Sequence, residues 1–410
     1  MSIDLTRSIS EVLPAEALDL TVDAGLGRAL GVEPETAVAP GSVSEIVAVL
    51  QWAGEAGVAV VPVGTGAHVN PRRPSGAYIA LTARRLSSVE IYEPDDLTMT
   101  AGAGALVRDL SREMDPHRQW LPFDPPDVQN RTLGGLAASG LTGPLSAAYG
   151  PIRNHVLGAT VVCGDGRVLR LGGRVVKNVA GFDVLKPVVG SRGDLAVITS
   201  VTVRLFPVPA VDRVLMLDAP DVAELVAAAR ATATAPILPA SIVLTSGAGS
   251  ARLLVRLHGA AATVDAEQRR LEIHAGVAFQ AADGTDGMDV ALAARDSGLG
   301  AGVRVRLWAL PSRLGELLDL ATAVPDASTL ADACGGSVTV SVPEVGPDAE
   351  ATFAELRAEV EALGGGTRAL QLPSDLDPAA INSEASRAEA ELAGRVRFAF
   401  DPDNALWGTP

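Results

Sequence analysis

The sequence predicts an α+β protein of two domains, the first with interleaved strands and helices and the second with an antiparallel sheet. Its 410 residues exceed one typical hydrophobic core. Strand and helix patterns alternate as far as Phe206, where Pro207-Val208-Pro209 interrupts the chain. Beyond Pro209 the pattern reads strand, helix, strand, strand, helix. That order favours an antiparallel sheet with helices on one face.

These patterns divide the chain into four parts. We expect an N-terminal extension over residues 1–34, a first domain over 35–210, a second domain over 211–385, and a C-terminal segment over 386–410 that returns to the first domain. Hydrophobic residues make up 48% of the sequence, which is enough for two cores.

The first domain begins with a strand–helix–strand unit that leads into a glycine-rich turn. Ser42 or Ser44 can cap the helix, which ends at Gly57. The second strand, Val58 to Val63, leads directly into Gly64-Thr65-Gly66-Ala67. Backbone N–H groups of such a turn can converge on a pyrophosphate because no Cβ atom blocks the approach. The third glycine and the following helix of a Rossmann fingerprint are missing, so a different dinucleotide-binding fold is indicated.

Next come strands over 78–81, 89–94 and 97–105 and a helix over 106–114, followed by a second region of small residues at 132–140. In this region several turns carry almost no side chain, so a flat ligand can lie against the backbone. Alternatively, these residues only permit close packing of a helix on a sheet. Further strands flank the hairpin signal Asp165-Gly166, and the apolar run 195–206 closes the domain. Together, the two glycine-rich regions suggest a flavin.

Five segments follow one another in an order typical of one family. They are PVGTGAHVN, YEPDDLTMTAGAGALVRDL, LPFDPPDVQNRTLGGLAASGLTGP, YGPIRNHVLGATVVCGDGRVLRLGGRVVKNVAGFD and GSRGDLAVITSVTVRLFPVP. Together they resemble the FAD-binding domain of the vanillyl-alcohol oxidase and p-cresol methylhydroxylase (VAO/PCMH-type) superfamily. Within it, GGLAASGLTGP and VKNVAGFD are most similar to the E subunits of bacterial glycolate oxidases. The resemblance covers roughly residues 35 to 210. For the second domain, the antiparallel sheet is similar to the cap domain of this superfamily.

The resemblance implies FAD as the cofactor and assigns three groups of residues to it. The pyrophosphate would be held by Val63, Gly64, Thr65, Gly66, Ala67 and His68. The isoalloxazine and ribityl chain would be lined by Thr132, Gly134, Gly135, Ala138, Ser139 and Gly140. Adenine and flavin would be bracketed by Gly193, Ala196 and Ile198. Some superfamily members attach FAD covalently through a histidine of the first turn. Since the register of His68 is one residue beyond that position, we expect noncovalent binding.

The catalytic base is not identified from the sequence. The weak candidates for a catalytic role are Lys177, Tyr149 and Arg153. Lys177 can place an ammonium near the flavin and stabilise its reduced anionic form, or it can pair with Asp183 in a structural turn. Related catalytic dehydrogenases carry a closely spaced histidine pair for a divalent metal. The five histidines here contain no such pair, so no metal site is expected.

Composition excludes several classes of function. The formal net charge of −16 argues against nucleic-acid binding. Cys163 and Cys334 lie far apart, which predicts neither a disulfide framework nor an iron–sulfur site. Without a secretion signal or an apolar run of about 20 residues, we expect a cytoplasmic protein whose membrane association, if any, comes through partner subunits.

The resemblance implies the FAD-binding subunit of a glycolate oxidase complex. Its partners would be a D-like catalytic flavoprotein and an F-like iron–sulfur subunit, and a small 2-hydroxy acid would be oxidised to a 2-oxo acid. Two alternatives stay open: a stand-alone 2-hydroxy-acid oxidase, and a scaffold that has lost its cofactor. Arg192 and Ala196 replace the usual Glu and second Gly of the GSEGTLG-like run, and the tail lacks a Phe-Asn-Pro-Gly sequence after Asp401-Pro402.

Overall fold

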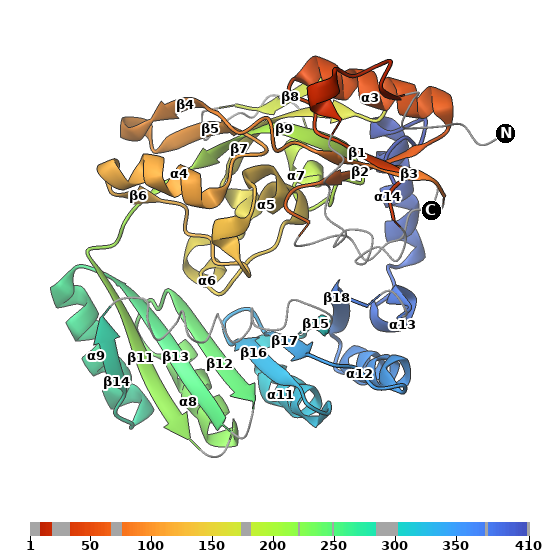
Figure 1. The fold of residues 1–410 in the computed structure, drawn as a ribbon. Coiled ribbons are helices and arrows are strands. Elements are labelled where there is room, and N and C mark those ends of the chain that lie inside the picture. Colours follow the sequence, from red (N-terminus) through yellow and green to blue (C-terminus); the bar gives the residue numbers. More distant parts are fainter. Residues whose placement is uncertain are drawn as a thin grey trace.

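The computed structural model describes residues 9–18, 33–66, 76–173, 182–219, 222–247, 250–283, 302–373 and 376–407. The chain forms two bodies: the first contains a three-stranded and a five-stranded sheet with their helices, and the second contains one eight-stranded sheet (Figure 1). Short 3-10 helices occur at Ala15–Ala17, Pro94–Asp96, Asp115–His117, Val128–Asn130, Ile152–Asn154 and Pro311–Arg313.

The first sheet is parallel, with the strand order β1-β3-β2. Its strands are β1 (Thr36–Val38), β2 (Ala59–Val63) and β3 (Tyr78–Thr82). Helix α3 (Val43–Ala56) connects β1 to β2 and buries Ile46, Val49, Leu50 and Ala53, which recur at helical spacing, in the same core as the sheet. The C-cap Gly57 has φ +66°, a left-handed conformation in which glycine is favoured.

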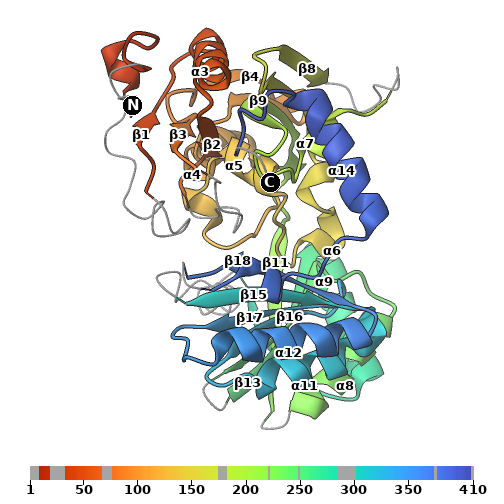
Figure 2. The ribbon, with the colours of Figure 1, turned by 90° about the vertical axis from the view of Figure 1, so that its right-hand side faces the viewer.

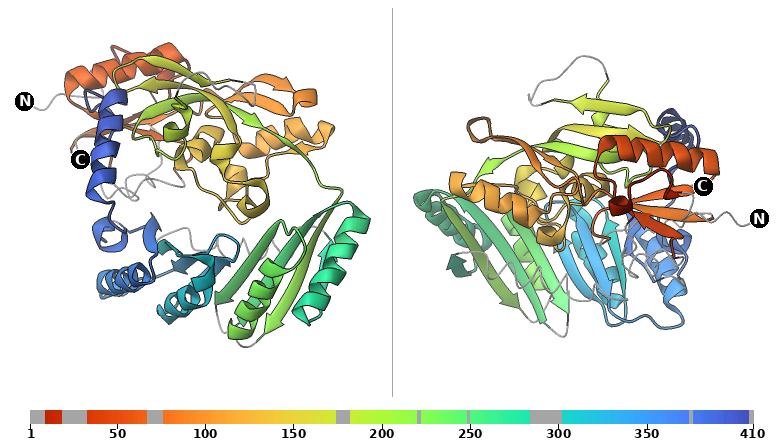
Figure 3. Two further views of the ribbon diagram at one scale, coloured as in Figure 1. Left: turned by 180° about the vertical axis from the view of Figure 1, so that it is seen from behind. Right: turned by 45° about the horizontal axis from the view of Figure 1, so that its top comes forward.

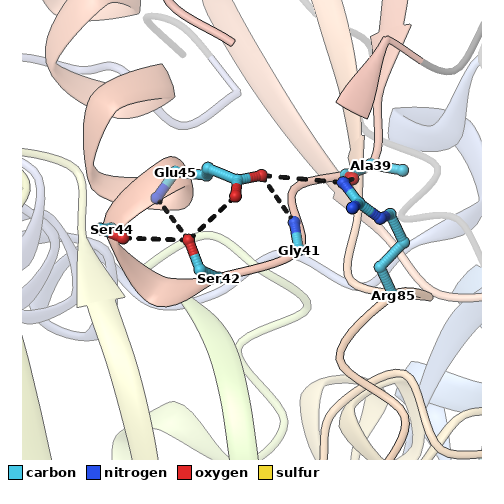
Figure 4. Close-up of polar contacts among 6 residues, drawn as sticks. All are labelled: Ala39, Gly41, Ser42, Ser44, Glu45 and Arg85. Carbon is cyan, nitrogen blue, oxygen red and sulfur yellow. Dashed lines mark hydrogen bonds and ion pairs between the residues drawn. The ribbon is translucent and has the colours of Figure 1, made fainter. Parts of the chain in front are cut away.

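Ser42 begins α3, in agreement with one of the two predicted caps (Figure 4). Its Oγ accepts the backbone N–H of Glu45 at 3.2 Å, and Glu45 Oε2 accepts the N–H of Gly41 at 2.8 Å. Arg85, which follows β3, donates from Nη1 to the carbonyl of Ala39 at 3.1 Å. These contacts fix the strand–helix–strand unit to the segment after β3.

The second sheet is antiparallel, with the strand order β4-β5-β9-β7-β8. Its strands are β4 (Val89–Glu93), β5 (Thr98–Gly102), β7 (Val156–Cys163), β8 (Val168–Gly172) and β9 (Ala196–Arg204). The helices of this region are α4 (Val107–Met114), α5 (Leu133–Ser139), α6 (Ser146–Tyr149) and α7 (Leu185–Val188). The predicted hairpin at Asp165-Gly166 joins β7 to β8, with Gly166 at φ +83°. Apolar residues of α4, α5 and α7 share one core with this sheet.

Two short strands, β6 (Gln119–Trp120) and β10 (Phe206–Pro207), pair where the chain leaves the first body. Beyond them lies an eight-stranded antiparallel sheet of order β14-β11-β13-β12-β16-β17-β15-β18. Its strands are β11 (Val211–Ala219), β12 (Ser241–Gly247), β13 (Ser250–Gly259), β14 (Gln280–Asp283), β15 (Val303–Trp308), β16 (Ser328–Asp332), β17 (Ser337–Val342) and β18 (Gly366–Gln371). Its helices are α8 (Val222–Thr234), α9 (Ala261–Ala275), α11 (Leu314–Ala323) and α12 (Ala349–Ala362).

This large sheet consists of two halves with the same order of elements. Each half reads strand, helix, strand, strand, helix, strand, and the halves join through β12 and β16. The four helices share one core with the sheet, and α8, α11 and α12 lie on the side of the sheet away from the first body (Figure 2). The predicted fold class, a two-subdomain first domain followed by an α+β domain with an antiparallel sheet, is confirmed.

The C-terminal part runs from the second body back to the first (Figure 3). Helix α13 (Pro378–Ile381) packs beside β18, and α14 (Arg387–Phe400) extends along the first body. Asp401 accepts the N–H groups of Ala405 and Leu406 at 2.8 and 2.9 Å. This turn sets Leu406 beside Val60 of β2 and buries Trp407 in the core of the parallel sheet. No helix among the described residues is both long enough and apolar enough to cross a bilayer.

Candidate functional site

A cavity of about 870 Å³ lies where the parallel sheet, strand β9 and helix α5 meet. We call it the first cavity. The residues predicted from the sequence that line it are Val63, Gly64, Thr65, Gly66, Thr132, Gly134, Gly135, Ala138, Ser139, Gly193, Ala196 and Ile198. The two glycine-rich regions, far apart in the sequence, therefore form one site.

The walls of the first cavity approach each other closely because the glycines that form them carry no side chains. A Cβ atom on Gly64 would lie 2.5 Å from Thr132 Oγ1, and one on Gly134 would lie 2.5 Å from Ala103 Cβ. Thr132 is the N-cap of α5, and its Oγ1 accepts the N–H of Gly135 at 3.1 Å. The turn after β2 thus touches the first turn of α5, and bare backbone lines the space between them.

Three arginines line the same cavity: Arg84 after β3, Arg131 before α5, and Arg192 before β9. Arg192 has a left-handed backbone, with φ +56°. Burial, together with the positive charge of Arg368, lowers the pKa of Arg192 to about 10, so the guanidinium still carries its charge at neutral pH. A cavity with this lining suits an anionic ligand with an extended flat part, as a dinucleotide is.

Of the predicted cofactor residues, one does not line the first cavity and two lie outside the described residues. Gly140 is the C-cap of α5 at φ +63°, and a Cβ there would lie 2.9 Å from the Cα of Gly190. Its small size is required by this packing rather than by the cavity. Ala67 and His68 lie outside the described residues.

Sequence reasoning missed the arginines and Trp407, which also lines the first cavity. No local sequence pattern marks Arg84 and Arg131 as site residues, because their place in the cavity depends on how the neighbouring sheets pack. Arg192 did carry a signal, because it replaces the acidic residue usual in its motif. Trp407 reaches the site only through the turn at Asp401.

The three weak catalytic candidates have other surroundings. The Tyr149 hydroxyl lies 2.9 Å from Nδ1 of His258 in the second body. Arg153 donates from Nη2 to the carbonyl of Val189 at 3.2 Å. Lys177 lies outside the described residues, so its pairing with Asp183 is not described either. Neither Tyr149 nor Arg153 lines the first cavity.

Tyr149 belongs instead to a contact between the two bodies. His258 Nε2 lies 3.1 Å from Asp212 Oδ1, and Arg256 pairs with Asp212 through both of its carboxylate oxygens, at 2.8 and 2.5 Å. Trp120 and Phe206 pack edge-on against the Tyr149 ring. Burial alone would raise the pKa of Asp212, but hydrogen bonds from Arg256 and His258 lower it to about 2.

The exchange Asp212→Asn is expected to lower the free energy of unfolding by about 3 kcal/mol at neutral pH, because Arg256 stays buried without its carboxylate. Chemical denaturation measures this difference. The folded-state pKa is below the ordinary value of 3.8, so the stabilisation is lost as the pH falls through that range, and the two proteins should converge in acid. As a control, Asp218→Asn removes an exposed pair with Arg252 and should cost less than about 1 kcal/mol. Equal losses in both variants would contradict this account.

A second cavity, of about 560 Å³, lies between the two bodies. From the first body it is lined by Pro126 and the segment 141–144, which follows α5. From the second body it is lined by Arg306, Leu330, Asp332, Ser337, Thr339 and Leu370. These residues come from β15 to β18. Their neighbours along the strands, such as Val305, Leu307 and Ala331, pack in the core that the helices cover. Because successive side chains of a strand point to opposite faces, the residues of the cavity stand on the face that the helices leave uncovered.

The two cavities are neighbours. Ser139 lines the first cavity and Leu141 the second, only two residues further along the chain. Arg131 of the first cavity donates from Nε to the carbonyl of Pro126 in the second. Arg368, whose charge acts on Arg192, pairs directly across the sheet from Arg306. A ligand in the second cavity would therefore lie beside the end of the first cavity nearest the C-terminus of α5.

Metal binding has no support in the part of the chain that the structure describes: no group of three or more His, Cys, Asp or Glu residues there could hold an ion. Cys163 and Cys334 are both free, and burial raises the pKa of each thiol to about 11.

A known family matches part of the first domain. Residues 34–172 match the family model of the FAD binding domain. The chain is 33% identical over 208 residues to a D-lactate dehydrogenase of Archaeoglobus fulgidus, covering 50% of this chain and 46% of that one. It is 28% identical over 256 residues to glycolate oxidase subunit GlcD of Bacillus subtilis, covering 58% and 54%. It is 39% identical over 119 residues to glycolate oxidase subunit GlcE of Escherichia coli, covering 29% and 34%. The chain thus spans about half the length of the first two relatives and about a third of the last.

Solved structures resemble the whole chain. Two structures of alkyldihydroxyacetonephosphate synthase match it with TM-scores of 0.73 and 0.74 at 16% identity, covering 100% of this chain and 85% and 86% of theirs. This similarity concerns the fold alone. The prediction of FAD as the cofactor is confirmed by the domain match, and the chain is homologous to D-lactate dehydrogenases and to glycolate oxidase subunits. Noncovalent attachment stays a prediction.

Proposed function

We propose that this chain is the FAD-carrying subunit of an enzyme that oxidises a small 2-hydroxy acid to a 2-oxo acid. The observation that carries the proposal is the pair of adjoining cavities. The first is a side-chain-poor site with three arginines, and the second is lined by a half-buried arginine, Arg306, from the other body. The names of the relatives favour this chemistry over other flavin reactions.

The first cavity fits FAD. The backbone of Gly64 to Gly66 can bind the diphosphate, and Arg84, Arg131 and Arg192 offer positive charge around it. The exposed backbone at Gly135 and the small side chains of Ala138 and Ser139 leave room for the flat ring system. When bound, FAD supplies the two-electron acceptor for the substrate's hydride.

The second cavity fits a small anionic substrate. Arg306 is half-buried, and its Nη2 donates to Ser337 Oγ at 3.2 Å, which fixes the orientation of the guanidinium. A guanidinium in such a cavity is suited to a carboxylate. Leu141, Leu330 and Leu370 form apolar parts of the wall, where a short carbon substituent can pack.

In this proposal the subunit works in a complex. A D-like flavoprotein would be a second site of substrate oxidation, and an F-like iron–sulfur protein would take the electrons from the flavins. The similarity to both GlcD and GlcE supports an assembly of this kind.

An anaerobic reduction experiment tests the proposal. The full chain is purified, loaded with FAD, and mixed with glycolate or D-lactate while the flavin absorbance is followed, first alone and then with D-like and F-like partners. We expect a yellow protein whose flavin is bleached by one of the acids, at the latest when the partners are present. A colourless chain that takes up no FAD, or a yellow complex that no 2-hydroxy acid reduces, would contradict the proposal.

A second candidate is a stand-alone 2-hydroxy-acid oxidase. One observation favours it: this chain alone provides both walls of the second cavity, including a cationic and an acidic side chain. Bleaching of the isolated chain at a rate that the partners do not change would select this candidate.

A further inference from the structure

The second cavity is lined by a half-buried carboxyl group, that of Asp332, to which the proposed function gives no role. Asp332 is the last residue of β16, and its side chain lines the cavity together with Arg306 of β15. Its Oδ1 accepts the N–H groups of Cys334 and Gly335, both at 3.0 Å. These two bonds hold the carboxyl group in place and use one of its two oxygens.

Arg306 and Asp332 are close enough for each charge to affect the other, but they form no direct ion pair. Arg306 binds Ser337 instead, the residue that pairs across the sheet with Asp332. Both charged groups therefore line one cavity without forming an ion pair with each other. A ligand that brings a negative group to Arg306 and a hydrogen-bond donor to Asp332 would complement both.

A 2-hydroxy acid has these two groups on adjacent carbons. We propose that Arg306 binds the substrate carboxylate and that Asp332 accepts the hydroxyl proton. This inference rests on the proposed function and deepens it, because it assigns the proton acceptor that the histidine content of the sequence left open.

The step is balanced without a further reactant. The substrate O–H bond breaks, and its proton goes to the Asp332 carboxylate. The C–H bond at the same carbon breaks and the carbon–oxygen bond becomes a carbonyl; bound FAD would supply the acceptor for the hydride and its two electrons. The substrate is oxidised and the flavin is reduced.

The surroundings of Asp332 suit a proton acceptor. Burial raises its pKa, against the opposing effects of the two N–H groups and of Arg306. Burial also raises the pKa of the nearby Cys334 thiol to about 11, so that thiol stays neutral, and Arg368 of β18 stands across the sheet from Arg306 on the same face. From the first body, the cavity is lined by Pro126 and 141–144, which bring no charged side chain. A carboxylate with a raised pKa binds a proton more readily than an exposed one.

The exchange Asp332→Asn tests the assignment through the reductive half-reaction. In the FAD-loaded full chain, anaerobic reduction by the preferred 2-hydroxy acid should slow by about 100-fold or more, because a positioned base contributes about 100- to 10,000-fold. The control Asp218→Asn changes another aspartate on the same face of the sheet, outside the cavity, and should reduce at the wild-type rate. Equal rates for wild type and Asp332→Asn would overturn the proposal, as would a wild-type chain that binds FAD but is not reduced with or without its partners.

Binding of oxalate, which resembles the substrate but cannot be oxidised in this way, gives a readout that does not depend on turnover. Oxalate binding to wild type, followed through the flavin spectrum, should weaken as the pH rises and Asp332 ionises, since the two negative charges repel each other. The neutral Asp332→Asn variant should bind at least as tightly and lose this pH dependence. An unchanged pH dependence would place Asp332 away from the ligand and overturn the proposal. FAD content, measured on the same samples, shows separately whether the proposed cofactor function holds.

Discussion

Replacing Ala138 by leucine is expected to weaken FAD binding by about 10- to 100-fold, the equivalent of about 1–3 kcal/mol of overpacking. Ala138 lies one turn after Gly134 and Gly135 on α5, on the face that lines the first cavity. Leucine is a good helix former, so α5 should be kept while its longer side chain fills space that the ring system needs. Fluorescence titration of the FAD-free chain with FAD measures the change.

The exposed Ala147 of α6 gives a matched control. Ala147→Leu is the same exchange in a helix that does not line the first cavity, and it should bind FAD as the wild type does. Thermal unfolding of both variants shows whether the chain is still folded. Folded Ala138→Leu protein with wild-type affinity for FAD would mean that the cofactor does not lie along this face of α5.

Replacing Arg306 by methionine is expected to weaken the binding of a small carboxylate, such as oxalate, by about 30-fold or more. When a charged pair is shielded from water in the complex, loss of one partner costs about 2–5 kcal/mol, and methionine keeps an apolar stem of similar reach without the charge. FAD affinity should stay unchanged, because Arg306 does not line the first cavity. Titration of FAD-loaded protein with oxalate, followed by the flavin spectrum, measures the effect.

Arg252 offers the control for this exchange. It stands on the same uncovered face of the large sheet, but it pairs with Asp218 and lies outside the second cavity. Arg252→Met should therefore bind oxalate with an affinity close to that of the wild type. Equal losses in the two variants would indicate a general effect of positive charge on this face rather than a site at Arg306.

The lining of the first cavity could be predicted from the sequence where it depends on local features. Short sequence patterns indicate both parts of the lining. One is the glycine-rich turn Gly64 to Gly66 directly after a buried strand, and the other is the run of small residues from Gly134 to Ser139. The capping of α3 by Ser42 and the hairpin at Gly166 are equally local. Such features depend on the absence of a Cβ or on a side chain that binds its own backbone, and both can be recognised without knowing the fold.

The second cavity could not be predicted, because it depends on strand order. Arg306 and Asp332 line the same cavity because β17 lies between β15 and β16. The apolar pattern of a strand does not predict which strand pairs with it. The contact between Tyr149 and His258 joins residues 109 positions apart, in different bodies. The sequence places Tyr149 among the catalytic candidates, whereas its hydroxyl contacts the second body.

The central claim is that the first cavity binds one FAD between the turn after β2 and helix α5. Its most direct test is a titration of the FAD-free full chain with FAD, compared with the same titration of Ala138→Leu. We predict saturation at one FAD per chain for the wild type and a clearly weaker curve for the variant. Absence of saturable FAD binding by the folded wild-type chain, or identical curves for the two proteins, would contradict the claim.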